Sequence, residues 1–249
     1  MKKIITLQVI FRKKINFIDF GIATTPKEVL DIQRLRQYKY VQKKYFSSNY
    51  AERKYDQDDL DKDEDTILLF AQLNGKETIG TVRIIQPDIL PTEEYFSFSE
   101  PRRIEDISRN QRVEISRLVI ARPKDDINIP RNLLLLFLIQ SMIFVAKQRG
   151  IQGGYAFLKA GIRGKLRYLN IPIHYIRNYT QRYPREGILA PYFGDPKDKV
   201  IPIYFLVEEI SSYLTEQVNN KKMFVQIDEN TYRLRKNLYT LFLKTLGII

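Results

Sequence analysis

The chain has 249 residues and contains no cysteine, which excludes disulfides, a thiol nucleophile and cysteine-ligated metal sites. Its single histidine, His174, excludes a multi-histidine metal centre within one chain. The formal net charge is +12, and because residues 52–65 carry a local balance of −5, the rest of the chain carries +17. Such a basic surface favours an anionic partner, whether nucleic acid, an acidic membrane or an acidic protein.

The first half of the chain shows strand-like alternation interrupted by one capped helix. Thr25, Pro26 and Glu28 have the spacing of a capping box, which predicts a helix from there to about Phe46. Asn74-Gly75 between two alternating segments is a strong hairpin signal. The predicted strands here are near 4–10, 15–22, 66–73 and 78–85, with a loop or frayed helix at 52–65 and an irregular excursion at 86–111.

The second half is built around a central strand at about 112–121. The apolar stretch 133–146 is too short to span a bilayer and predicts a buried helix, so we expect a cytoplasmic protein. The elements predicted after the central strand are a helix from Pro130 to Gly150, strands at 152–158, 171–179 and 201–207, a short basic helix at 160–169, and two helices near 208–219 and 229–246. This order predicts one α/β sheet domain at 1–207 with a C-terminal helical extension at 208–249 packed on it.

The central strand carries charged and polar side chains among apolar ones. Strand alternation puts Glu114 and Ser116 on one face and Arg117 on the other. Buried charges need partners. Glu114 therefore either forms a buried ion pair with an arginine or acts as a general base beside a cleft. Arg117 and Arg83 either hold a substrate carboxylate bidentately or pair with the acidic segment 52–65.

The remaining candidate sites are the single histidine, the basic helix, and any nucleotide-binding or hydrolase motif. His174 lies in an expected strand, where a single histidine is usually structural. The basic helix is either a solvated surface or a docking patch for an acidic partner. The patch would consist of Lys147, Arg149, Lys159, Arg163, Lys165 and Arg167. No P-loop, G-x-G-x-x-G or G-x-S-x-G motif is present, so nucleotide-phosphate binding and serine hydrolysis lack motif support.

Four short elements occur in order between about residues 25 and 170. They are Arg36 with Tyr40, Asp56 with Asp59, Gly80 with Arg83, and Glu114-Ile-Ser-Arg117. In this order they resemble the Arg-x-x-x-Phe, Asp-x-x-Asp, Gly-x-x-Arg and Glu-x-Ser-Arg elements of the autoinducer (N-acyl-homoserine-lactone) synthases and the long-chain N-acyl amino acid synthases. These families are GNAT-like N-acyltransferases. Phe46 falls where the family usually has tryptophan.

The resemblance implies a GNAT-like mixed β-sheet, splayed between the strands at 112–121 and 152–158, with crossing helices. It implies transfer of a fatty acyl group from acyl-carrier protein to the amine of an amino acid or similar small molecule. The donor would be an acyl-phosphopantetheine thioester, and we expect no tightly bound cofactor and no metal. Glu114 and Arg117 would be catalytic, and the substrate-binding residues would be Arg36, Tyr40, Phe46, Asp56, Asp59, Arg83, Leu118, Val119 and Ile120.

Departures from the family pattern shape the expected substrates. Coenzyme A-dependent relatives carry a glycine-rich pyrophosphate loop after the central strand, whereas residues 121–130 contain no glycine. The absence of this loop favours acyl-carrier protein over acyl-coenzyme A as the donor. Acyl-carrier proteins are acidic, which matches the positive charge of the basic helix. Tyr40 and Phe46 keep an aromatic wall but fit an altered acceptor pocket. Two alternatives stay open: a homoserine-lactone synthase that uses S-adenosylmethionine, and a basic nucleic-acid-binding protein. We expect no nucleic-acid partner, because no such module is recognisable; peripheral membrane contact through the acyl product is a further expectation.

Overall fold

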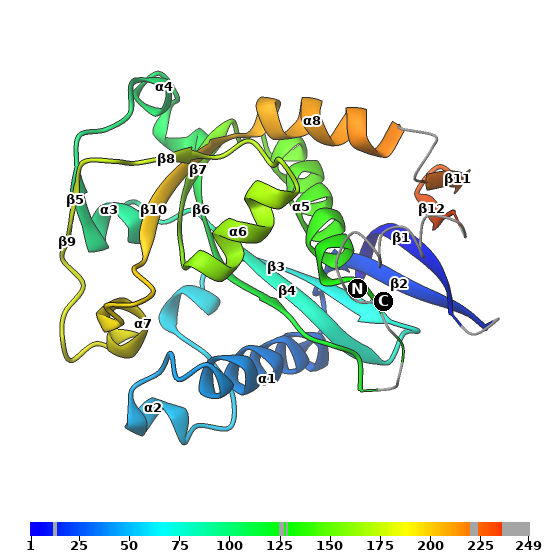
Figure 1. Ribbon diagram of the computed structural model, residues 1–249, viewed down its shortest axis with the longest axis horizontal. Helices are drawn as coiled ribbons and strands as arrows, with labels where there is room; N and C mark the ends of the chain where they lie inside the picture. Colours follow the sequence, from blue (N-terminus) through cyan, green and yellow to red (C-terminus); the bar gives the residue numbers. More distant parts are fainter. Residues whose placement is uncertain (12–13, 125–126, 128, 220–223, 236–249) are drawn as a thin grey trace.

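A ten-stranded mixed sheet runs through the computed structural model (Figure 1), which describes residues 1–11, 14–124, 127, 129–219 and 224–235. Its strands are β1 (Lys2–Phe11), β2 (Lys14–Ile22), β3 (Ile67–Leu73), β4 (Glu77–Ile85), β6 (Arg112–Ile120), β7 (Gly153–Leu158), β8 (His174–Tyr175), β10 (Ile201–Leu206), β11 (Phe224–Asp228) and β12 (Thr231–Leu234). A second sheet pairs β5 (Phe96–Phe98) with β9 (Tyr179–Gln181).

The order across the large sheet is β11-β12-β1-β2-β3-β4-β6-β7-β10-β8. Among the described strands, only the pairs β1–β12 and β6–β7 are parallel. The helices are α1 (Pro26–Gln42), α2 (Ser48–Ala51), α3 (Pro91–Tyr95), α4 (Arg102–Glu105), α5 (Arg131–Gln148), α6 (Ala160–Tyr168), α7 (Ala190–Gly194) and α8 (Val207–Asn219), with 3-10 turns η1 (Asp59–Asp61) and η2 (Arg109–Gln111). The predicted mixed α/β class and the hairpin of β3 and β4 are confirmed.

The two faces of the sheet are covered by different helices. Leu68 and Phe70 of β3 pack with Ile32 of α1, whereas Ile67 and Leu69 belong to the core cluster that contains α5. Because successive strand residues point to opposite faces, α1 and α5 lie on opposite sides of the sheet (Figure 1). By length and composition α5 could cross a membrane, but 72% of it is buried inside the protein, as expected of a core helix.

Helix α1 begins as predicted and ends earlier. Thr25 and Glu28 form the complete capping box. The helix stops at Gln42 and not near Phe46, because Lys44 adopts a left-handed conformation with φ of 56°. Phe46 therefore lies beyond the helix end and packs against Tyr40 and Tyr50.

Strands β6 and β7 pair over a short distance and then separate. Only Arg112, Val113 and Glu114 have partners on β7, at Gly153, Gly154 and Tyr155. At position 154 a Cβ atom would lie 1.9 Å from the carbonyl oxygen of Val113, so this close approach requires glycine. Beyond this point β7 continues in pairing with β10, while β6 stays with β4. The predicted splay between the two strands is thus confirmed.

A β-bulge in β6 changes which face Arg117 uses. Thr81 pairs with Val119 and Arg83 with Ser116, so two residues of β6 oppose one residue of β4. Arg117 takes the left-handed conformation, with φ of 53°. The expectation that Arg117 and Ser116 face opposite sides is wrong, because both bind groups of one polar network. A non-glycine residue in this conformation marks a site under constraint.

The C-terminal part is not wholly helical. Helix α8 confirms the first predicted helix, but β11 and β12 form a hairpin across Glu229-Asn230, and β12 extends the sheet beside β1. The predicted helix at 229–246 is wrong for residues 231–234, and residues 236–249 lie outside the described residues. Phe224 and Leu234 are buried in the main core, which explains why the hairpin docks there.

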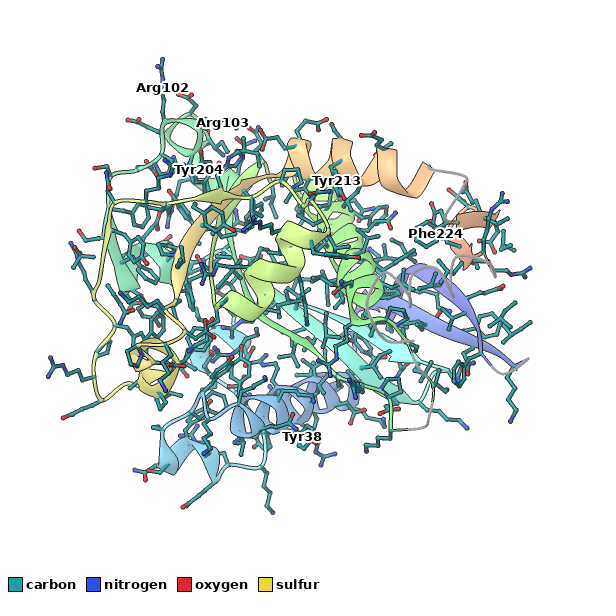
Figure 2. The ribbon with its side chains drawn as sticks, in the orientation of Figure 1. Tyr38, Arg102, Arg103, Tyr204, Tyr213 and Phe224 are labelled. Carbon is teal, nitrogen blue, oxygen red and sulfur yellow. The ribbon has the colours of Figure 1, made fainter. Side chains whose placement is uncertain are left out.

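The predicted strand at 171–179 is also wrong over most of its length. Only His174 and Tyr175 pair with β10, and Tyr179 already belongs to the second sheet. His174 Nε2 lies 2.6 Å from Glu209 Oε2, and its ring stacks on Tyr204. Arg103 binds the same Glu209; Figure 2 shows Arg103 and Tyr204 near the α4 end of the molecule. The expectation of a structural histidine fits this bridge between β8 and α8.

Candidate functional site

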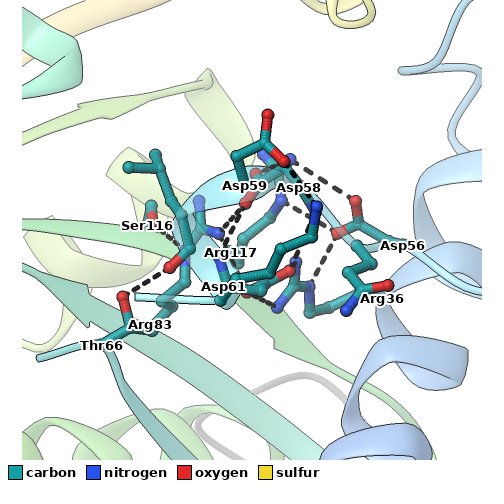
Figure 3. A network of polar contacts seen from close by, with 12 residues as sticks. Arg36, Asp56, Asp58, Asp59, Asp61, Thr66, Arg83, Ser116 and Arg117 are labelled. Atoms are coloured by element: carbon teal, nitrogen blue, oxygen red, sulfur yellow. Dashed lines mark hydrogen bonds and ion pairs between the residues drawn. The ribbon is translucent and has the colours of Figure 1, made fainter. Parts of the chain in front are cut away.

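Three arginines and three aspartates form a closed ring of charges where α1, β4 and β6 meet the acidic segment (Figure 3). Each arginine binds two of the aspartates, and each aspartate binds two of the arginines. The ring charges are Arg36, Arg83, Arg117, Asp56, Asp58 and Asp61. The interpretation that Arg83 and Arg117 pair with the acidic segment is therefore confirmed.

The ring charges balance one another in a buried place. Arg36 and Asp56 are fully buried, with Nε and Oδ2 2.7 Å apart. Burial opposes ionisation of Asp56, but the charges of Arg117 and Arg36 outweigh it and lower the pKa of its carboxyl. Burial likewise opposes ionisation of Asp58, and Arg117 and Arg83 bring its pKa to about 2. The three positive charges are thus met by three negative ones, and the ring holds α1 against β4 and β6.

Asp59, predicted as a substrate-binding residue, is outside the ring. Its side chain is 97% exposed and pairs with Lys62 on the surface. The acidic run contains two overlapping Asp-x-x-Asp spacings, and the structure uses Asp58 and Asp61 in addition to Asp56. The sequence signal for the second pair is the capping-box spacing of Asp58 and Asp61 at η1. Each of these two side chains accepts a hydrogen bond from the backbone N–H of the other residue.

Glu114 is buried away from the arginines. Its carboxylate accepts hydrogen bonds from the hydroxyl of Thr92 at 2.8 Å and from the Thr92 N–H at 3.3 Å. Of the two interpretations of Glu114, the ion pair with an arginine is wrong, because Thr92 of α3 is its hydrogen-bond partner. Burial raises the pKa of Glu114 to about 8, even though the hydrogen bonds from Thr92 act in the opposite direction. Its catalytic role stays a prediction.

A cavity of about 140 Å³ occupies the splay between β6 and β7. One part of its wall is aliphatic and comes from β4, β6, β7, β10, α5, α6, α8 and the loop after α6; the other part is aromatic and cationic. The aliphatic part consists of Val82, Ile115, Leu118, Leu138, Ile139, Met142, Ala156, Leu158, Ile162, Leu166, Ile171, Ile173, Ile203 and Ile210. The remaining wall consists of Tyr40, Tyr45, Ser116, Arg117, Phe157, Lys159, Leu189, Tyr192 and Phe205.

The aromatic part of the wall is a row of three tyrosines, with one cation over the first ring and a second cation shared by the other two. The rings of Tyr40 and Tyr45 are 5.7 Å apart, and those of Tyr45 and Tyr192 are 4.9 Å apart. Arg117 lies over Tyr40 at 5.5 Å, and Lys159 lies 5.1 Å from both Tyr45 and Tyr192. Cations placed on aromatic faces in this way are attracted to the rings.

Some of the predicted substrate-binding residues line the cavity, and others hold the surrounding elements together. Tyr40, Arg117 and Leu118 line the cavity. Arg36, Arg83 and Asp56 hold the surrounding elements together and do not line it, and Phe46 supports Tyr40 from behind. Val119 and Ile120 continue β6 beyond the cavity, in register with Thr81 and Gly80. Sequence reasoning missed Tyr45 and Tyr192, because burial beside a cavity has no local signature.

One of the six residues predicted as a docking patch is not at the surface. Lys159 is only 4% exposed and lines the cavity. Lys147 and Arg149 lie before β7, whereas Arg163, Lys165 and Arg167 lie on α6 after it. Lys147 also pairs with Glu208 of α8.

A different cluster of cations gathers around the start of α5. Burial and the charges of Arg131 and Lys43 lower the pKa of Lys165. Burial and the charges of Arg131, Lys43 and Arg122 lower that of Lys39. The cation cluster therefore unites α1, the segment after β6, the start of α5, and α6; its members are Lys39, Lys43, Arg122, Arg131 and Lys165. In the described part of the chain, no group of three or more His, Cys, Asp or Glu side chains is arranged to hold a metal.

Comparison with known proteins agrees with this geometry. Residues 35–125 match the family model of the acetyltransferase (GNAT) domain. No curated protein matches the sequence significantly. The AHL synthase LasI aligns with a TM-score of 0.56 at 13% identity, over 81% of this chain and 95% of LasI. FeeM, an N-acyl amino acid synthase from uncultured soil microbes, aligns with a TM-score of 0.53 at 14% identity, over 79% of this chain and 94% of FeeM.

A third solved structure extends the likeness to nearly the whole chain. BjaI, a CoA-dependent acyl-homoserine lactone synthase, aligns over 98% of this chain and 99% of its own, with a TM-score of 0.52 at 14% identity. At these identities the structural likeness establishes the fold, while the matched domain establishes the kind of chemistry. The chain is therefore an acyltransferase that contains a GNAT domain and has the fold of the AHL synthases and of an N-acyl amino acid synthase.

Proposed function

We propose that this protein transfers a fatty acyl group from acyl-carrier protein to the amine of an amino acid or similar small molecule. The observation that carries the proposal is the cavity in the splay between β6 and β7, with its aliphatic wall beside an aromatic, cationic one. An acyl chain gains free energy by burial against the aliphatic wall. A polar acceptor suits the tyrosine row and the two cations.

In the proposed reaction, the thioester carbonyl of the donor lies beside β6. The free amine of the acceptor attacks this carbonyl, the C–N bond forms, the C–S bond breaks, and the thiol of the phosphopantetheine arm leaves. The bulge in β6 leaves backbone groups of its extra residue outside the ladder, next to Leu118 on the cavity wall. These groups are the proposed donors to the developing oxyanion. Glu114 would accept the amine proton through water, since its carboxylate is not on the wall.

Two features support acyl-carrier protein as the donor. Residues 121–130 contain no glycine, so this segment lacks the glycine-rich composition of a pyrophosphate loop. Two members of the cation cluster, Arg122 and Arg131, lie just after β6 and at the start of α5. An acidic carrier protein carrying a phosphate-linked arm matches the charge of this cluster. MesI and BjaI, by contrast, are described as CoA-dependent, so the donor needs a direct comparison.

A homoserine-lactone synthase reaction is the second candidate. It is favoured by the fold match to TofI, solved in a ternary complex with an inhibitor and MTA, and to BjaI, solved with SAM and isopentyl-CoA. In this chain Tyr40 lines the cavity together with Tyr45 and Tyr192. Consumption of SAM during turnover distinguishes this candidate from transfer to an ordinary amino acid.

The test is incubation of the purified full chain with dodecanoyl-carrier protein or dodecanoyl-CoA and a panel of amino acids, with SAM as a separate arm. We expect an N-acyl amino acid by mass spectrometry, formed at least about tenfold faster from the carrier-protein donor. A lactone product with loss of SAM would select the second candidate. Absence of any acylated amine from either donor would refute the proposal.

A further inference from the structure

Lys159 is a buried cation on the cavity wall that takes no part in the ring charges. Its ammonium lies 3.1 Å from the carbonyl oxygen of Asp198 and 3.4 Å from the carboxylate of Asp195. The Asp195 side chain is 41% exposed, so water screens its charge. Lys159 precedes α6, and the N–H of Ala160 binds the Asp198 carboxylate, which holds this corner together.

Arg117, the other cation of the wall, is already neutralised. Its guanidinium binds Asp56 and Asp58, both of which belong to the balanced ring charges. The wall of the cavity contains no acidic side chain among the described residues. Lys159 is therefore the wall cation whose charge is least compensated by a buried acid. Its ammonium has three N–H donors, and the two contacts to Asp195 and Asp198 leave one for a ligand.

We propose that Lys159 binds the carboxylate of the amine acceptor, which makes the acceptor an amino acid and not a simple amine. This inference rests on the proposed acyl transfer and names the acceptor class of the same site. A carboxylate would satisfy the third donor of the ammonium, which lies over the Tyr45 and Tyr192 rings. The ring arginines, which the sequence suggested for this task, are all occupied by aspartates.

The test measures binding and turnover separately with matched ligands. Each amino acid is paired with its own amide, which keeps the amine and the side chain and removes the negative charge. Binding is measured by calorimetry to the full chain, with a thioether analogue of dodecanoyl-carrier protein present. For wild type we expect the acid to bind about 10- to 100-fold more tightly than the amide, the range of one charge-assisted hydrogen bond.

Lys159→Met should abolish this preference while leaving the affinity for the amide unchanged, and Lys159→Arg should retain part of it. Lys76→Met, in the exposed turn between β3 and β4, is the matched control and should behave as wild type. The inference is overturned if wild type binds no amino acid, or if Lys159→Met weakens acid and amide equally, as a purely structural lysine would. If the preference depends on Lys159 but no acyl group is transferred, Lys159 binds an amino-acid carboxylate and the proposed reaction fails.

Discussion

Replacing Asp56 by asparagine should lower the free energy of unfolding by about 3–5 kcal/mol, because it leaves buried guanidinium groups without their counter-charge. Asp56 accepts hydrogen bonds from Arg36 and Arg117 and from the hydroxyl of Tyr50. Asparagine has nearly the same shape but only one acceptor oxygen and no charge. The measurement is the urea midpoint and slope of the purified variant at neutral pH.

The matched control for this prediction is Asp59→Asn, three residues along the same acidic run. Asp59 is exposed and pairs only with Lys62, so its variant should unfold like wild type. Acyl transfer should also fall strongly in Asp56→Asn, because Arg117 loses a partner that fixes it on the cavity wall. Equal stability of the two variants would contradict a ring that holds α1 against the sheet.

Glu114→Gln should remove a pH dependence of stability that wild type shows between weakly acidic and alkaline solution. Burial raises the pKa of Glu114 to about 8 from its ordinary value of 4.5, so the folded state holds a proton that the unfolded state has lost. This contribution to stability is fully present below the unfolded pKa and is lost as the pH rises through about 8. Glutamine mimics the protonated acid and can keep both contacts to Thr92.

Between about pH 6 and about pH 9, the stability of wild type relative to Glu114→Gln should therefore fall by about 3 kcal/mol. Urea unfolding of both proteins across this range is the measurement, and the variant cancels the titration of other groups. If Glu114 is also the proton acceptor, kcat/KM of wild type should rise through pH about 8 and the variant should lose most of its activity. Full activity of Glu114→Gln would remove Glu114 from the mechanism.

Local signals predicted the elements that local interactions determine. The capping box at Thr25, the Asn74-Gly75 turn and the long apolar helix each appear where expected, since their hydrogen bonds or burial depend on nearby residues. The hairpin of β11 and β12 was missed because its turn at Glu229-Asn230 lacks glycine or proline. Its stability comes from distant contacts, such as that of Phe224 with Phe137.

The sequence predicted residues of the site but not how these residues are arranged in space. The spacing Asp-x-x-Asp occurs twice within Asp56–Asp61, and only the positions of the arginines select Asp58 and Asp61 over Asp59. The face of Arg117 depends on a bulge set by pairing between β4 and β6. The burial of Lys159 depends on residues 195–198, which are far along the chain. Such long-range placement has no signature in a single sequence.

The central claim is that the cavity between β6 and β7 receives the acyl chain during transfer. Ile162 lines its aliphatic wall from α6, and Ile162→Phe fills part of the space without adding charge. Ile15→Phe, on an exposed position of β2, is the control. The measurement is the transfer rate from a series of carrier-protein donors from butyryl to hexadecanoyl. We predict that Ile162→Phe lowers the rate for the longest chains by about tenfold or more and leaves butyryl transfer within about twofold of wild type. An unchanged chain-length profile would contradict the claim.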